Sequence, residues 1–322
     1  MSRITVVIPV YNEEACLEAL FERLQRLNEG QPDDYDFLFV DDGSRDNSRE
    51  IIRSLAQGHP AVRYLFFSRN FGHEMATTAG LDHADGDAVV IIDADLQDPP
   101  EVIPRLVERW REGNEVVYAK RKTRKGENVL KRFTAWLFYR LINKLSDVPI
   151  PADTGDFRLM DRQVVEGFRR CRERNRFVRG LVSWTGFRQT AVEYERDARA
   201  GGETKYGFFK LLRLTFDAVT GFSSVPLRIG VMLGLVVCVV AFIQAVRIFV
   251  EKMFWGIPIE GYALLATGIF FLGGVQLLVI GLLGEYIGRI YTQVQERPLY
   301  IVREKSDVLP AVDPERDRRE TP

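Results

Sequence analysis

The chain has 322 residues, of which 46% are hydrophobic, 11% aromatic and 28% charged. This composition is too apolar for a disordered chain, and the length suits about two domains. With 44 basic and 45 acidic residues the net charge is -1, which disfavours a nucleic-acid-binding protein that works through bulk positive charge.

The first 120 residues alternate strand-like and helix-like segments. Runs rich in β-branched and aromatic residues predict buried strands at 4–10, 37–40, 62–67, 88–92 and 116–119. Apolar residues at helical spacing predict helices after Asn12, over 46–56 and from Pro99 to Trp110, with Asn12 as the N-cap of the first. This alternation predicts an α/β fold with an open, mostly parallel sheet covered on both faces. Such sheets bind ligands at the carboxyl ends of their strands.

Three polar clusters follow predicted strands, with the sequences PVYNE at 9–13, VDDGS at 40–44 and DADLQD at 93–98. Neither a glycine-rich dinucleotide fingerprint nor a P-loop accompanies them, so the sheet must bind its ligand in another way. Asp93 and Asp95 project to the same side of an extended segment, and oxygen ligands at that spacing suit Mg²⁺ or Mn²⁺ carrying a diphosphate. An aspartate that caps the helix at Pro99 explains the motif equally well, so both interpretations stay open at this point.

Two stretches have the pattern of helices lying in a membrane interface. In 126–146, apolar residues form one face and basic residues punctuate the other, and 206–222 is rich in Phe and Leu. Cations at headgroup depth can hold a lipid phosphate, and our candidates are Arg121, Lys131 and Arg132. A helix packed on the sheet with a solvated basic face is the alternative; the neighbouring apolar segments favour the interface.

Two charge-free segments near the C-terminus are long enough to cross a bilayer. They run from 229 to 246 and from 261 to 284, about 18 and 24 residues. Basic residues flank the pair on its outer sides, whereas the loop 251–260 holds only Lys252. This bias predicts a multi-pass protein of the cytoplasmic membrane with both termini in the cytoplasm. The N-terminus has no signal-peptide pattern, so the strand-rich region should stay on the same side.

Seven motifs occur in a characteristic order ahead of the two predicted spans: VVIPVYNEE, VDDGSRD, RNFGHE, DADLQDPP, DTGDFRLM, RNRFVRGL and RAGGETKY. Together they resemble the inverting, GT-A-fold glycosyltransferases of family 2, and among these the enzymes that act on polyprenyl phosphates. The resemblance extends to about Arg303. One departure is His73, where related enzymes often carry Lys, which puts a basic contact to substrate in doubt at this position.

The resemblance implies roles for individual residues. The nucleotide sugar would be bound by Pro9, Tyr11, Glu13, Asp41, Asp42, Asp93, Arg199 and Lys205, the last two at the diphosphate. The metal ion, Mg²⁺ or Mn²⁺, would be held by Asp95 and Gln97. The residues implied in catalysis are Asp93, Asp95 and Asp156. For Arg199 and Lys205, ordinary positive charge beside a membrane is the alternative, but Gly201-Gly202 favours a loop that closes over substrate.

Asp156 could act as a general base or orient the sugar. A phosphomonoester acceptor is largely ionised at neutral pH and is already a nucleophile, so we expect Asp156 to position substrate. Three nearby arginines, Arg174, Arg176 and Arg179, fit a phosphate site or a basic helix face equally well.

We therefore expect transfer of a single sugar from a nucleotide sugar such as UDP-glucose to a polyprenyl phosphate such as undecaprenyl phosphate, with inversion. The residues leave the sugar open among glucose, mannose, galactose and modified aminosugars. The expected divisions are a GT-A core at 1–125, an acceptor-side region at 126–225, two membrane helices at 226–290 and a tail at 291–322. The partners are the donor, the lipid acceptor and the bilayer, with no nucleic acid, and the small residues of the spans permit a homo-oligomer. A processive polysaccharide synthase and a non-catalytic scaffold or flippase helper are the alternatives.

Overall fold

The computed structural model describes residues 1–28, 32–122, 154–174, 176–195, 225–254 and 261–306. The chain forms two compact units, one from residues 1–143, 148–206 and 297–322 and the other from 144–147 and 207–296. The predicted interface helices, and with them Lys131, Arg132, Arg199 and Lys205, lie outside the described residues.

Eight strands in the described part of the first unit form one sheet in the order β7-β5-β6-β4-β1-β2-β3-β8. They are β1 Arg3–Val10, β2 Asp34–Asp41, β3 Val62–Phe67, β4 Ala88–Ile91, β5 Val116–Arg121, β6 Thr154–Asp161, β7 Gln189–Tyr194 and β8 Val302–Lys305. Only β6 and β8 run against the direction shared by the other six. The expected α/β fold with a mostly parallel sheet is confirmed.

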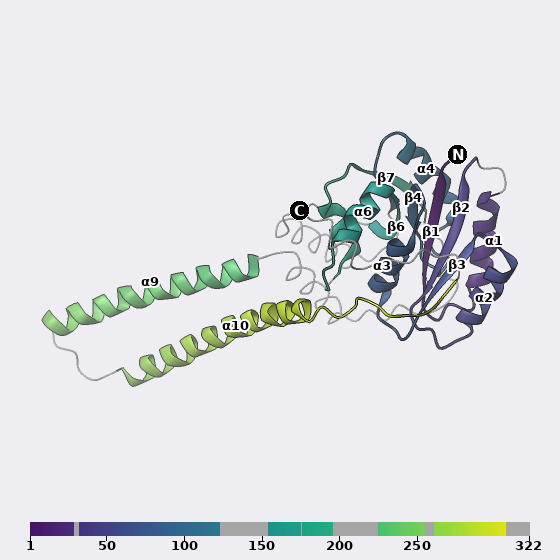
Figure 1. Cartoon of the computed structure of the whole chain (residues 1–322). Coiled ribbons are helices and arrows are strands. Elements are labelled where there is room, and N and C mark those ends of the chain that lie inside the picture. The colour runs from purple at the N-terminus through teal and green to yellow at the C-terminus, as the bar shows by residue number, and fades with distance from the viewer. Residues whose placement is uncertain (29–31, 123–153, 175, 196–224, 255–260, 307–322) are drawn as a thin grey trace, which may run out of the picture. The chain divides into compact units, whose positions relative to one another are not determined.

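Helices cover both faces of this sheet (Figure 1). They are α1 Leu17–Asn28, α2 Ser48–Gly58, α3 His73–His83, η1 Pro100–Val102, α4 Ile103–Arg111, α6 Arg162–Arg170 and α7 Val178–Trp184. Side chains of α1, α2 and α4 share one core with Ile4 and Ile8 of β1. On the other face α3 packs so closely that a Cβ at Gly80 would lie 2.1 Å from Cγ1 of Val7. Alternate residues of β1 thus serve the two cores.

Two local expectations were wrong or incomplete. Asn12 does not cap a helix: α1 begins at Leu17, and Asn12 adopts a φ of 56° while its Oδ1 accepts the backbone N–H of Arg45 at 2.8 Å. Asn tolerates this left-handed conformation because its short side chain bonds locally. The sequence also yielded no helix at α3. Residues 76–83 of α3 are all buried, so the helix lacks the polar face that marks amphipathic helices.

After the second unit the chain returns to the first unit, where it adds the edge strand β8 to the sheet. There β8 pairs with β3 antiparallel, and Arg53 donates two hydrogen bonds of 2.9 Å to the carboxylate of Glu304. Just before β8, the ring of Tyr300 stacks on Phe67, and its hydroxyl donates to Asp82 at 2.9 Å. The described residues 300–305 therefore pack against the β3 edge of the first unit.

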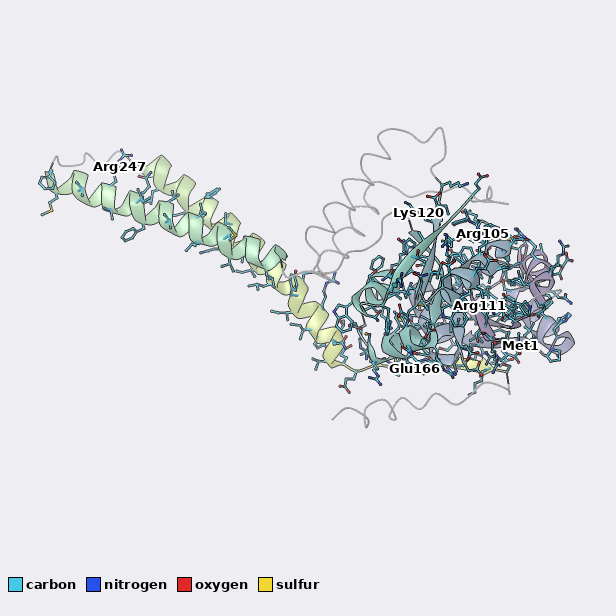
Figure 2. The ribbon with its side chains drawn as sticks, turned by 90° about the horizontal axis from the view of Figure 1, so that it is seen from above. Met1, Arg105, Arg111, Lys120, Glu166 and Arg247 are labelled. Carbon is cyan, nitrogen blue, oxygen red and sulfur yellow. The ribbon has the colours of Figure 1, made fainter. Side chains whose placement is uncertain are left out.

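The second unit contains the long helices α9, Val225–Phe254, and α10, Tyr262–Val294. A Cβ at Gly230 of α9 would lie 4.0 Å from side-chain atoms of Val279 and Leu282 of α10, so the two helices pack as a hairpin. Side chains project outward from both helices (Figure 2). Many of them are large and apolar, and Val231 and Phe242 of α9 are more than 70% exposed. Exposed apolar surface of this extent needs an apolar partner.

Among the described residues, one segment, Phe271–Val294, is long and apolar enough to cross a bilayer. In α9 the apolar segment Gly230–Gln244 is shorter, so the second expected span is not confirmed. The candidate span also reaches further than expected. Glu285 and Arg289, which we expected to lie beyond it, form an ion pair of 3.0 Å along the helix, and this pairing lowers the cost of their charges.

Candidate functional site

A hollow of about 430 Å³ opens where β1, β2 and β4 end. From β1 the chain adds β2 and β3 on one side and then places β4 on the other, so the hollow lies at the switch point where such sheets bind ligands. Its volume falls in the range of small-molecule sites. Its lining comprises Pro9, Val10, Tyr11, Glu13, Asp42, Asn70, Gly72, His73, Ala76, Asp93, Ala94 and Asp95.

The end of β1 and the loop after it bring together three of the predicted residues, Pro9, Tyr11 and Glu13. The loop is fixed by its neighbour after β2: the backbone N–H of Asn12 donates to the hydroxyl of Ser44, and that of Glu13 to the hydroxyl of Ser48, both at 3.0 Å. The side chains of Tyr11 and Glu13, together with Pro9, form part of the lining of the hollow.

The two aspartates at the end of β2 have different surroundings. Asp41 is fully buried; its carboxylate accepts the N–H groups of Gly43 and Ser44 at 3.2 Å and an Nε–H bond from Arg49 at 2.6 Å. It is not among the residues that line the hollow. Asp42 does line it, and its carboxylate accepts the N–H groups of two residues of the loop after β3. Burial raises the pKa of Asp42, while those two hydrogen bonds oppose the shift.

Gly43 is required by the close approach of this second loop. It has a φ of 77°, and a Cβ there would lie 2.4 Å from the backbone carbon of Arg69. The turn after β2 and the loop after β3 therefore pack backbone to backbone. This contact explains the DDG sequence and sets the position of Asn70 and Gly72 in the wall of the hollow.

The segment after β4 carries the DADLQ motif. Asp93 and Asp95 both line the hollow, and the backbone N–H of Gln97 donates to Asp95 Oδ1 at 3.1 Å. Leu96, between Asp95 and Gln97, has a φ of 59°, which is a strained conformation for a bulky residue. Backbone strain of this kind clusters at functional sites. Burial raises the pKa of Asp93 to about 6 against the opposing effect of His73.

A divalent cation at these residues would need further ligands from substrate and water. Within the described ranges, no group of three or more His, Cys, Asp or Glu side chains is close enough to hold a metal ion. Mg²⁺ sites in phosphate-handling proteins often need only one or two carboxylates, because substrate oxygens and water complete the shell. The carboxylate of Asp95, on the lining of the hollow, fits such a site, whereas Gln97 is buried and is not among the lining residues.

The N-terminus of α3 connects the hollow to Asp156 of β6. His73 lines the hollow, and its Nε2 lies 3.7 Å from Asp93 Oδ1 and 3.4 Å from Asp156 Oδ2. Asp156 is buried, and its carboxylate accepts two hydrogen bonds from Arg179 of α7. Burial alone would raise the pKa of Asp156, but His73 and Arg179 hold it well below its usual range.

Arg121 is the expected acceptor-side cation that lies among the described residues, and it is the last residue of β5. A Cβ at Gly155 would lie 3.0 Å from Arg121 Nη2, so the guanidinium rests beside the residue that precedes Asp156. Arg121 Nε also donates to the hydroxyl of Tyr194 at 3.3 Å. Arg121 of β5 therefore lies beside Gly155, the neighbour of Asp156 in the sequence. The other two expected cations, Lys131 and Arg132, fall outside the described ranges.

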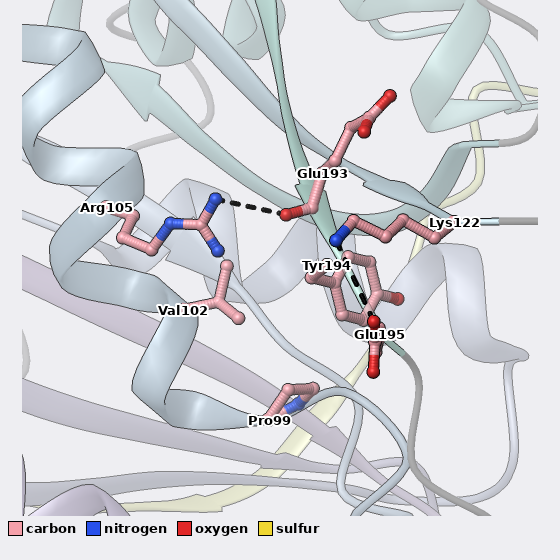
Figure 3. Close-up of a pocket in the computed structure, with 7 residues that line it drawn as sticks. All are labelled: Pro99, Val102, Arg105, Lys122, Glu193, Tyr194 and Glu195. Carbon is pink, nitrogen blue, oxygen red and sulfur yellow. Dashed lines mark hydrogen bonds and ion pairs between the residues drawn. The ribbon is translucent and has the colours of Figure 1, made fainter.

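A second hollow, of about 480 Å³, lies beside β7 and α4 (Figure 3). Two cations on its wall are directed at acceptors of the chain itself: Arg105 donates to the backbone carbonyl of Glu193 at 3.1 Å, and Lys122 lies 3.7 Å from Glu195. Its lining includes none of Asp42, Asp93 and Asp95. The first hollow is therefore the better candidate for the functional site.

The sequence leaves open whether the arginines after β6 form a phosphate site or a basic helix face. The structure gives two of them different surroundings. Arg176 is buried over the ring of Phe168 and donates to the carbonyl of Cys171, so it is not part of a solvated basic face. Arg179 binds Asp156. The links of His73 and Arg179 to Asp156 were missed, because they join residues far apart in the sequence.

Comparisons with known proteins agree with this architecture. The family model described as glycosyl transferase family 2 matches residues 5–168, and that of the GtrB C-terminal hairpin matches residues 225–290. The uncharacterized glycosyltransferase YkcC of Bacillus subtilis (strain 168) is 49% identical over 93% of both chains. A prophage-derived bactoprenol glucosyl transferase of Shigella flexneri is 46% identical over 94% of this chain and 97% of its own.

Among solved structures, mannosyl-3-phosphoglycerate synthase from Rubrobacter xylanophilus is 19% identical and covers 68% of this chain and 72% of its own, with a TM-score of 0.47. The family model spans the sheet from β1 to β6, and the two sequence relatives extend over nearly the whole chain. The chain therefore belongs to glycosyl transferase family 2.

Proposed function

We propose that this protein transfers one glucose from a nucleotide sugar, UDP-glucose, to a polyprenyl phosphate, undecaprenyl phosphate, at a membrane surface and with inversion. The observation that carries the proposal is the convergence of Asp42, Asp93, Asp95 and His73 on one hollow at the switch point of the sheet. The choice of glucose and of a polyprenyl acceptor is supported by a relative named bactoprenol glucosyl transferase, which aligns over 94% of the chain.

On the donor side, Pro9, Tyr11 and Glu13 would bind the nucleotide base, and Asp42 would border it. Asp93 would contact the nucleotide. Asp41 contributes indirectly, because its buried carboxylate holds the turn that presents Asp42. Arg199 and Lys205 would approach the diphosphate, and they lie outside the described residues.

Asp95 and Gln97 are the residues that would hold Mg²⁺ or Mn²⁺. A divalent cation bound there would neutralise the negative charge that develops on the leaving diphosphate. Burial around the DADLQ segment strengthens such electrostatic interactions, because the local dielectric constant is lower than that of water.

In the reaction, a phosphate oxygen of the acceptor attacks the anomeric carbon of the sugar and forms the new C–O bond. The bond from that carbon to the diphosphate oxygen breaks, and its electron pair leaves with the nucleoside diphosphate. The acceptor phosphate has a second pKa of about 6 and needs no strong base. Asp156 would therefore position the reactants, and Arg121, Lys131 and Arg132 would attract the acceptor phosphate.

The hairpin of α9 and α10 would anchor the enzyme in the bilayer. Both helices would cross it, with the two termini and the catalytic unit in the cytoplasm. The exposed apolar side chains of both helices support this proposal, as does the candidate span within α10. An anchored enzyme meets its insoluble acceptor at the membrane surface while the donor arrives from water.

The test uses the purified full chain in detergent with UDP-[¹⁴C]glucose, undecaprenyl phosphate and Mg²⁺ or Mn²⁺. Label should enter the lipid fraction, and Asp95→Asn should lower the rate by about a hundredfold or more. Glu112→Gln is the matched control, since the side chain of Glu112 is exposed and forms a surface ion pair with Arg109. No labelled lipid with the wild type would contradict the proposal, and a labelled polymer would favour a processive synthase.

A further inference from the structure

We propose that His73 and Glu74, the first two residues of α3, are positioning residues that hold the carboxylate of Asp156 in place from two sides. His73 acts on Asp156 directly, and Glu74 acts through the start of α7. This inference rests on the proposed function, because Asp156 matters to the rate only if the hollow is the transfer site.

His73 connects two carboxylates that come from different strands. Asp93 follows β4, and Asp156 lies on β6, its antiparallel neighbour in the sheet. The Nε2 atom of His73 is 3.7 Å from an oxygen of the first and 3.4 Å from an oxygen of the second. Without a cation between them, two carboxylates this close would repel each other and move apart.

The charge of His73 fits this task. Burial alone would favour the neutral imidazole, but Asp156 and Asp93 raise the pKa of His73 to about 9. The imidazolium is then the main form at neutral pH. A Lys side chain would supply the same charge on a longer stem, whereas Gln would supply only a neutral donor.

Glu74 reaches the same carboxylate by another route. Its Oε2 accepts the backbone N–H of Val178 at 2.9 Å, and Val178 is the first residue of α7. That N–H is one of the donors a helix leaves unsatisfied at its N-terminus. The following residue, Arg179, binds Asp156 through Nε at 2.8 Å and Nη2 at 3.0 Å. Glu74 therefore fixes the backbone from which the arginine reaches Asp156.

The two links explain why a buried acid at this place keeps one orientation. Asp156 Oδ1 is held by Arg179, and Oδ2 faces both Arg179 and His73. Both supports come from the first turn of α3, and the same helix packs against β1 two turns later through Gly80 and Val7. A shift of α3 would release both supports together, and a displacement of about 1 Å can cost about a hundredfold in rate.

The experiment compares four variants of the full chain under saturating acceptor, with kcat and the donor KM measured separately. We expect His73→Gln to lower kcat by about tenfold or more and to change the donor KM by less than about threefold. His73→Lys should recover most of the lost kcat. Glu74→Gln keeps an oxygen that accepts the Val178 N–H and should retain activity within about threefold, whereas Glu74→Ala should resemble His73→Gln.

Thermal unfolding of each variant separates positioning from general damage. If His73→Gln kept the wild-type kcat, or if His73→Lys were as slow as His73→Gln, the positioning role of His73 would be overturned. Equal losses in Glu74→Gln and Glu74→Ala would overturn the role of the Val178 contact. Failure of the proposed function is distinguishable, because then the wild-type protein itself would transfer no glucose to the lipid.

Discussion

Arg179 donates two hydrogen bonds to the carboxylate of Asp156, from Nε at 2.8 Å and from Nη2 at 3.0 Å. The pair links a helix to an interior strand of the sheet, since Arg179 lies on α7 and Asp156 on β6. A planar guanidinium that binds a carboxylate through two parallel bonds fixes orientation as well as charge. Asp156 is 8% exposed, so little water competes for it.

Arg179→Lys tests the geometry of this pair at constant charge. Lysine offers a point charge instead of a fork, so Asp156 would lose its fixed orientation. We expect kcat for glucose transfer to fall by about ten- to a hundredfold, with the protein still folded. Steady-state kinetics beside a thermal unfolding curve would measure this, and Arg109→Lys, on the exposed side of α4, is the matched control. Wild-type kcat in Arg179→Lys would show that the two-bond geometry is not needed.

Gly80→Ala tests the packing of α3 on the sheet. The added Cβ would lie 2.1 Å from Cγ1 of Val7, a β-branched residue whose side chain cannot easily rotate away. Overpacking of this kind should lower the free energy of unfolding of the catalytic unit by about 1–3 kcal/mol. Chemical denaturation measures the change. Gly58→Ala is the control, because nothing lies within 4 Å of its Cβ position, and equal stability of the two variants would contradict the packing described here.

The sequence predicts the sheet and the strand-end acids because both obey local rules. Short apolar runs identify the strands, and parallel strands bring their carboxyl ends to one edge. That is why Asp42, Asp93 and Asp95 could be expected near each other. Asp41, one residue before Asp42, was expected to line the base pocket but binds its own turn and Arg49 instead. Alternation along the chain sends neighbouring side chains in opposite directions.

Other parts of the site depend on contacts that have no local signature. The edge strand β8 has only four residues with alternating exposure, and it is recognised by its pairing with β3 and by the Arg53–Glu304 contact. His73 stands 83 positions before Asp156 in the sequence, and only the fold brings them together. Long-range pairs of this kind follow from topology, which a single sequence does not specify.

The raised pKa of His73 predicts how stability depends on pH in the absence of donor and divalent cation. A group whose pKa rises from 6.5 to about 9 on folding stabilises the folded state fully below pH 6.5, and this contribution is lost as the pH rises through about 9. We expect Tm to fall between pH 6.5 and 9.5, and to fall less in His73→Gln. Differential scanning fluorimetry of both proteins in EDTA would measure this. Parallel pH curves would contradict the pairing of His73 with Asp93 and Asp156.

The central claim is that one glucose moves directly from donor to lipid phosphate by in-line displacement. Proton NMR of the purified lipid product measures both parts of it, because the H1–H2 coupling reports the anomeric configuration and the glucose signal reports the number of sugars for each lipid. From α-linked UDP-glucose we expect one β-linked glucose on each polyprenyl phosphate. An α-linked product, or more than one glucose for each lipid, would contradict the account.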